Sequence, residues 1–139
     1  MNIKQNTVTQ TPENWKKVSN MLGIQDNDFL GGIERCEFSL EKLSAILELG
    51  FITLKHKFNN SPTVETFYEF GKRAEGYGAT VDFLGFLESK YRKDARLVVE
   101  GVKVTSFSDS ANLILDFSQT FHDADEFTAN AVLLRAWYD

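Results

Sequence analysis

The chain has 139 residues, of which 42% are hydrophobic and 25% are charged, and its formal net charge is −5. These values are typical of one ordinary globular domain and exclude a disordered tail, a collagen-like chain, a coiled coil and a disulfide-rich scaffold. The acidic excess gives no general attraction to nucleic acid or anionic lipid. We expect a single domain over residues 11–139, preceded by a loose lead-in of residues 1–10 that shows no periodic pattern.

The sequence also predicts where the protein resides. No apolar run approaches the roughly 18 residues that a membrane-spanning helix needs. The first ten residues are polar and lack the apolar region of a secretory signal. Cys36 is the single cysteine and cannot form an internal disulfide, which fits a reducing compartment. We therefore expect a cytoplasmic protein without membrane contact.

The first predicted element is a helix over residues 12–22. The Thr11 hydroxyl is a suitable N-cap, and Pro12 suits the first helical position because no N–H is needed there. An apolar stripe follows at spacings of three and four residues, made of Trp15, Val18 and Leu22.

A short strand and a second helix are expected next. The pair Gly31-Gly32 marks a turn, and residues 33–38 fit a strand. Ser39 is a candidate N-cap for a helix over residues 40–49. Residues 51–58 alternate in pattern and include β-branched side chains, which favours a strand, although a helical period also fits them.

The segment Asn59-Asn60-Ser61-Pro62 is the clearest break in the chain. Ser61 as N-cap and Pro62 at the first position predict a third helix. Its expected buried stripe consists of Val64, Phe67, Tyr68, Gly71 and Ala74.

Residues 79–88 and 97–104 change to a period of two, and a short polar connector joins them. This pattern predicts an antiparallel hairpin. Gly85 and Gly101 lie inside the two strands and indicate bulges or a close approach of the backbones.

A helix over residues 108–121 and a terminal strand over residues 127–138 complete the predicted elements. The predicted fold is α+β: a mainly antiparallel sheet of about three to five strands with helices packed on one face. If the last strand followed its helix by a right-handed crossover, the sheet would be mixed.

Two groups of residues are candidate binding sites. The connector carries the basic cluster of the chain with one aromatic residue, and such residues can contact phosphates and stack on a base: Lys90, Tyr91, Arg92, Lys93 and Arg96. At the C-terminal end, Trp137 and Tyr138 would point to opposite faces of a strand. We expect one of these two rings in the core and the other, taken as Trp137, exposed as an anchor for a partner.

Catalytic and metal sites are weaker candidates. His122 stands close to Asp123, Asp125 and Glu126, which could hold a divalent cation, but the spacing matches no calcium loop. Cys36 with a histidine could form a nucleophile and base, although a lone cysteine more often packs as a small apolar side chain. We assign no catalytic residue, metal ligand or cofactor.

The leading functional hypothesis is therefore a non-catalytic protein-interaction or regulatory module that binds a protein partner or self-associates. Two alternatives stay open. One is a nucleic-acid-binding domain that uses the basic loop of residues 90–96, and the other is a small metal-dependent hydrolase near His122.

Overall fold

A twisted antiparallel sheet with helices on one face organises the chain. The computed structural model describes residues 10–25, 32–91, 95–108 and 110–139. The sheet has the strand order β1-β2-β3-β5-β4, and every neighbouring pair is antiparallel. In chain order the elements are α1 (Pro12–Met21), β1 (Ile33–Ser39), α2 (Leu40–Leu49), α3 (Val64–Gly76), β2 (Thr80–Glu88), β3 (Leu97–Thr105), α4 (Ala111–Thr120), β4 (Glu126–Ala129) and β5 (Leu134–Trp137).

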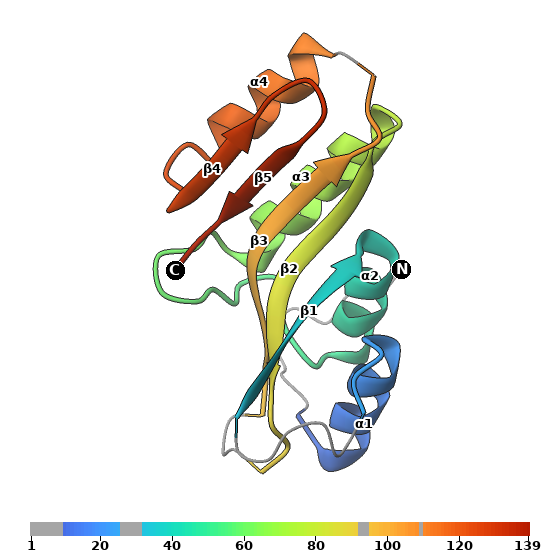
Figure 1. Cartoon of the computed structure of the whole chain (residues 1–139). Coiled ribbons are helices and arrows are strands. Elements are labelled where there is room, and N and C mark those ends of the chain that lie inside the picture. The colour runs from blue at the N-terminus through green and yellow to red at the C-terminus, as the bar shows by residue number, and fades with distance from the viewer. Residues whose placement is uncertain (1–9, 26–31, 92–94, 109) are drawn as a thin grey trace.

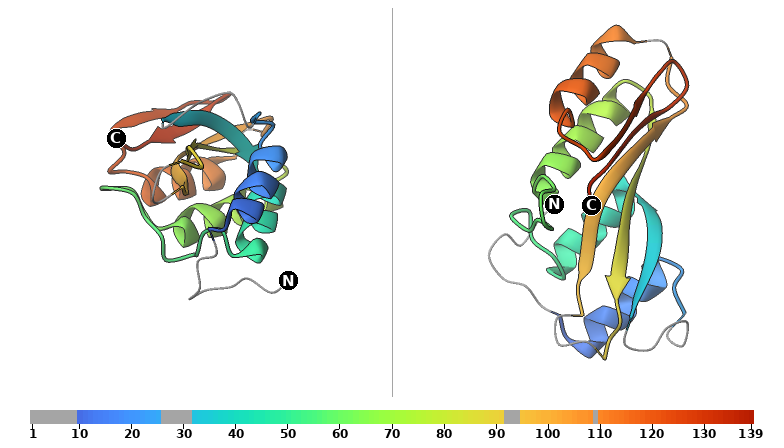
Figure 2. Two further views of the ribbon diagram at one scale, coloured as in Figure 1. Left: turned by 90° about the horizontal axis from the view of Figure 1, so that it is seen from below. Right: turned by 60° about the vertical axis from the view of Figure 1, so that its left-hand side comes forward.

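All the helices lie on the same side of the sheet (Figures 1 and 2). The opposite side faces the viewer in Figure 1, and no helix of the described residues covers it; we call it the open face. The predicted α+β class, a single domain with one sheet and helices on one face, is confirmed. No helix in the described ranges is long and apolar enough to cross a membrane. The lead-in that we predicted over residues 1–10 lies almost entirely outside the described residues.

Side-chain caps determine where the helices begin. The hydroxyls of Thr11 and Ser39 accept hydrogen bonds from backbone N–H groups three residues ahead, as predicted. The third helix begins later than predicted, because the Thr63 hydroxyl accepts from the Thr66 N–H at 3.4 Å. Ser61 instead accepts from the Phe58 N–H at 3.0 Å and so stabilises the preceding turn.

The predicted strand over residues 51–58 is wrong. This segment is a loop that crosses the core with four consecutive buried residues, so its pattern is not the alternation of a strand: Phe51, Ile52, Thr53 and Leu54. Its carbonyl groups bond to the start of α3, where Glu65 N–H donates to Leu54 O at 2.9 Å. The backbone of this loop thus bonds to a helix end, whereas a strand would bond to a neighbouring strand.

The β2–β3 hairpin is confirmed, and both glycines permit close backbone contact. A Cβ on Gly85 would lie 2.1 Å from the Val98 carbonyl oxygen. A β-bulge between Leu84 and Gly85 leaves Glu100 without a partner in the register. Because of the bulge, the side chains of β3 that pack into the core under the helices are those of Leu97, Val99, Val102 and Val104.

The predicted single strand over residues 127–138 is two strands, β4 and β5, joined by a tight turn. The Asn130 side chain makes this turn, since its Oδ1 accepts from the N–H groups of Val132 and Leu133 at 2.9 Å each. β5 pairs with β3 antiparallel, so the crossover and the mixed sheet are also wrong.

Buried phenylalanines explain the aromatic composition. Phe67 contacts the rings of Phe83, Phe121 and Tyr138 between the sheet and the helices. Most aromatic residues therefore serve the core and not the surface.

An ion pair joins two of the helices. Arg73 on α3 binds Asp116 on α4 through two hydrogen bonds of 2.8 and 3.0 Å. This arginine lowers the pKa of the Asp116 carboxyl group.

Candidate functional site

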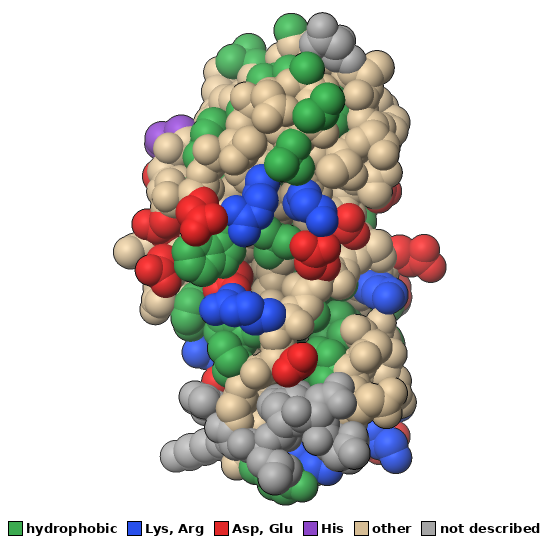
Figure 3. All heavy atoms as spheres, in the orientation of Figure 1, with side chains coloured by type: hydrophobic (Ala, Val, Ile, Leu, Met, Phe, Trp, Pro, Cys, Tyr) green, Lys and Arg blue, Asp and Glu red, His purple; other side chains and the backbone are tan. Residues whose placement is uncertain are grey.

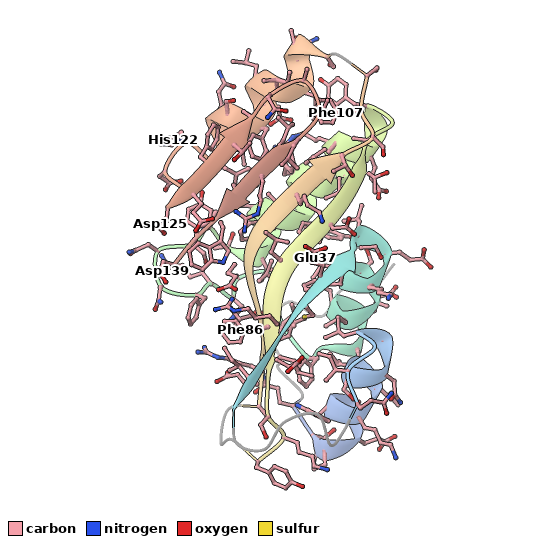
Figure 4. The ribbon with its side chains drawn as sticks, viewed as in Figure 1. Glu37, Phe86, Phe107, His122, Asp125 and Asp139 are labelled. Atoms are coloured by element: carbon pink, nitrogen blue, oxygen red, sulfur yellow. The ribbon has the colours of Figure 1, made fainter. Side chains whose placement is uncertain are left out.

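A pocket of about 340 Å³ lies on the open face of the sheet. Its side chains come from β1, β2, β3 and β5, namely Arg35, Glu37, Leu84, Glu100, Arg135 and Trp137, with Cys36 and Gly85 completing the lining. In Figure 3, basic and acidic side chains gather over the middle of this face, and Figure 4 shows Glu37 on β1 beside it. The volume is at the lower end of the range for ligand sites, roughly 300–1,000 Å³.

The strand register brings the residues of the pocket side by side. Glu37 pairs with Leu84, Leu84 with Gly101, and Gly101 with Trp137 across four strands. A Cβ on Gly101 would lie 2.6 Å from the Ala136 carbonyl oxygen and 3.1 Å from Leu84 Cδ1, so the Leu84 side chain packs over this glycine. The pocket therefore has an apolar floor, with Trp137 on one side and Glu37 on the other.

Ion pairs surround this apolar floor. Arg35 on β1 pairs with Glu100 on β3. Lys103 Nζ lies 3.0 Å from a Glu37 carboxylate oxygen, and Arg135 Nη1 lies 2.9 Å from a Glu126 carboxylate oxygen. Each charge has a partner of opposite sign, so the surroundings of the pocket are neutral overall while they remain strongly polar.

The two members of the Arg35–Glu100 pair differ in exposure. The Glu100 side chain is 4% exposed, whereas the Arg35 side chain is 62% exposed and its guanidinium lies 5.9 Å from the centre of the Phe86 ring. Burying a carboxylate is costly unless it is paired. The Arg35 guanidinium therefore compensates the buried Glu100 carboxylate, while most of the Arg35 side chain is exposed.

Several hydrogen-bond donors at the pocket are unengaged. Arg35 and Arg135 each donate one side-chain hydrogen bond to a described residue, which leaves about four N–H groups on each guanidinium. The Trp137 indole N–H donates to no described residue, and the side chain is half-buried. The pocket consequently offers donors beside an aromatic surface.

Cys36 lines the pocket but is a poor nucleophile there. Burial, followed by the nearby Glu100 and Glu34 carboxylates, raises the pKa of its thiol to about 12. The reactive form of cysteine is the thiolate, which is scarce at neutral pH under these conditions. Neither His56 nor His122 lines the pocket.

Three residues of the predicted basic cluster, Lys90, Tyr91 and Arg96, lie in the described part of the chain. The Lys90 ammonium lies 5.1 Å from the centre of the Tyr91 ring, and Tyr91 is 64% exposed. Arg96 instead turns back to Glu88, with 2.6 Å between Nε and a carboxylate oxygen. Arg92 and Lys93 lie outside the described residues.

The two C-terminal aromatic residues point to opposite sides of the sheet, as predicted, but Trp137 is half-buried where we expected it to be exposed. Tyr138 is 1% exposed and its hydroxyl donates to the Asp123 carboxylate at 2.7 Å. Burial and this carboxylate raise the pKa of Tyr138. Trp137 lines the pocket on the open face, opposite to the core.

The acidic group near His122 is spread over separate contacts. The His122 ring nitrogen Nδ1 lies 3.1 Å from Gln119 O, and Asp125 accepts from the Asp139 N–H at 2.7 Å. Figure 4 shows His122, Asp125 and Asp139 at the edge of the molecule. Across the described ranges, no group of three or more histidine, cysteine or acidic side chains could hold a metal ion.

Most of the pocket was not predicted from the sequence. Of its residues, the sequence singled out Trp137 as a binding residue, and it gave no such role to Arg35, Glu37, Glu100 or Arg135. A usable signal was present, because charged residues inside strands indicate a sheet face that is not covered by helices.

Comparison of the chain with known protein families, with curated proteins and with solved structures finds no match. The function is therefore inferred from the geometry of the open face.

Proposed function

We propose that this chain is a non-catalytic protein-interaction module and that the open face of the sheet, with Trp137 as its anchor, contacts the partner. The observation that carries the proposal is the pocket, in which a half-buried tryptophan adjoins an apolar floor and unengaged arginine N–H groups. Tryptophan and arginine are among the residue types most enriched at binding hot spots.

The arrangement around the pocket supports contact with a polypeptide segment. Leu84 gives an apolar floor, and the ion pairs of Arg35, Glu37 and Arg135 form a polar margin around it. Protein interfaces commonly have this combination of an apolar centre and a polar rim. The rim would set the orientation of the partner, while the half-buried Trp137 would supply apolar area that the contact buries.

A non-catalytic role is supported by the state of the ionisable groups that line the pocket. The Cys36 thiol has a raised pKa, and each carboxylate in the lining pairs with a cation. A general base or nucleophile needs an accessible group with a pKa near the working pH. The Cys36 thiol is not such a nucleophile, and both carboxylates of the lining are held in ion pairs.

The substitution Trp137→Ala tests the proposal. It removes the anchor from a strand position on the open face, and we expect at least tenfold less partner captured by affinity purification from cells. Tyr91→Ala is the matched control, because Tyr91 is an exposed aromatic residue outside the pocket. Equal capture by the wild type and Trp137→Ala, or a loss confined to Tyr91→Ala, would contradict the proposal.

Self-association and nucleic-acid binding are tested by separate measurements on the same two variants. A homodimer formed through the open face would give twice the monomer mass in light scattering and would revert to monomer with Trp137→Ala. Nucleic-acid binding has the exposed Tyr91 and its contact with Lys90 in its favour. That alternative predicts a salt-sensitive gel shift that Tyr91→Ala weakens and Trp137→Ala leaves unchanged.

A further inference from the structure

We infer that the pocket binds an acidic segment of the partner, with an aspartate or glutamate carboxylate at the arginines and a neighbouring apolar side chain against Trp137. This inference rests on the proposed function, because it specifies the chemistry of the segment that the open face would contact. It depends on which polar groups in the pocket are still free to bind.

The unengaged groups are mostly donors. Arg35 and Arg135 each keep about four free N–H groups, and the Trp137 indole adds one more. A carboxylate accepts several hydrogen bonds and pairs with guanidinium in a planar, two-pronged geometry. An acidic side chain is therefore complementary to what the pocket presents.

Both carboxylates that line the pocket already pair with a cation of the protein. Both Glu37 oxygens lie within 3.2 Å of the Lys103 ammonium. Glu100 accepts from Arg35, and its side chain is 4% exposed. A basic guest would compete with Arg35 for Glu100 or with Lys103 for Glu37, whereas an acidic guest can use the N–H groups that these pairs leave unengaged.

The net charge of −5 opposes an acidic partner only at long range. Interactions between exposed charges are screened beyond about 8 Å at physiological ionic strength. The arginine, indole and carboxylate groups that line the pocket act at shorter range, so the N–H groups left unengaged there can decide which segment binds.

Selection from a random peptide library displayed on phage tests the inference and does not require that the partner be identified. The full chain is the target, and the Trp137→Ala variant is used for counter-selection. We expect enriched peptides that carry aspartate or glutamate next to an aromatic or large aliphatic residue. Enrichment of basic peptides, or of neutral ones, would overturn the carboxylate inference and leave the proposed function standing. Absence of any enrichment that depends on Trp137 would overturn both.

A matched peptide pair then isolates the carboxylate. The enriched peptide and its glutamate-to-glutamine (or aspartate-to-asparagine) version are compared on the wild type, on Arg135→Gln and on Arg73→Gln. Arg73 is the control because it also pairs with a carboxylate but lies on the helical side of the molecule. We expect at least tenfold weaker binding for the neutral peptide and for Arg135→Gln, and no change for Arg73→Gln. Equal affinity of the two peptides for the wild type would overturn the inference.

Discussion

Gly85 determines how closely β2 approaches β3, and through this contact it shapes the floor of the pocket. Any side chain there would run into the Val98 carbonyl, which belongs to the backbone and cannot rotate away. The same closeness places Leu84 on the open face beside Glu100 and Gly101. A residue without a side chain is thus required both for the hairpin and for the site.

Gly85→Ala should destabilise the protein by about 1–3 kcal/mol, because the added methyl group can be accommodated only by moving backbone. Chemical denaturation of the variant and the wild type measures this change. Gly76→Ala is the control, since nothing lies within 4 Å of a Cβ at that helical position. We expect that variant to be as stable as the wild type or more stable by about 0.4–1 kcal/mol. Equal stability of Gly85→Ala and the wild type would contradict this prediction, because β2 and β3 would then move apart at no cost in the free energy of unfolding.

At the level of single residues, the sequence predicted what depends on near neighbours in the chain. The caps at Thr11 and Ser39 and the opposite orientation of Trp137 and Tyr138 follow from local geometry, and the structure has them. The meeting of Arg35 with Glu100 depends on register across three strands and on a bulge. Neither the strand order nor the bulge position can be read from spacing along the chain.

Among the elements, the loop over residues 51–63 differs most from its prediction. Its apolar residues suggested a strand, but their burial comes from crossing the core beside α3. Farther along the loop, the Phe58 ring lies 5.4 Å from the Phe86 ring, between their centres. The loop therefore covers part of the sheet around Phe86, and the pocket lies beyond that covered part.

The β4–β5 turn was missed for a different reason. Residues 127–138 keep a continuous alternating pattern, and alternation does not distinguish one long strand from two short strands joined by a turn. The signal that could have located the turn is Asn130, because asparagine side chains often bond to backbone N–H groups two or three residues ahead.

His56 makes the loop over residues 51–63 sensitive to pH. Its Nε2 is buried and has no hydrogen-bond partner among the described residues. Burial, aided by the Arg96 guanidinium and opposed by the Glu88 carboxylate, lowers the pKa of His56 below its ordinary value of 6.5. Protonation therefore favours the unfolded chain. The contribution of neutral His56 to the free energy of unfolding is complete above pH 6.5. It falls as the pH drops below that value towards the lower pKa of the folded state.

Urea denaturation at pH values above and below 6.5 tests this effect. We expect the wild type to lose stability at the lower pH and His56→Gln to lose less. His122→Gln is the control, because the His122 ring is exposed and bonds only to a backbone carbonyl among the described residues. If His56→Gln and the wild type lost the same amount, His56 would not be the group responsible.

At the scale of the whole molecule, the two faces of the sheet have different tasks. The helical face holds the phenylalanine core, whereas the open face carries charged residues, Leu84 and Trp137. An antiparallel sheet can leave one face to solvent, and the polar residues of that face are then free to bind. The fold as a whole thus places the candidate contact surface opposite the part of the molecule that stabilises it.

The most direct test of the open face as contact surface uses the two tryptophan indole resonances in a nitrogen–proton correlation spectrum. Trp15 is an internal reference, because its indole N–H donates to Glu88 O at 2.9 Å in the interior. On addition of the selected acidic peptide, we predict that the Trp137 indole signal shifts with the backbone signals of β1 and β5, while the Trp15 signal stays in place. An unchanged Trp137 signal in the presence of bound peptide would contradict the assignment of the open face as the contact surface.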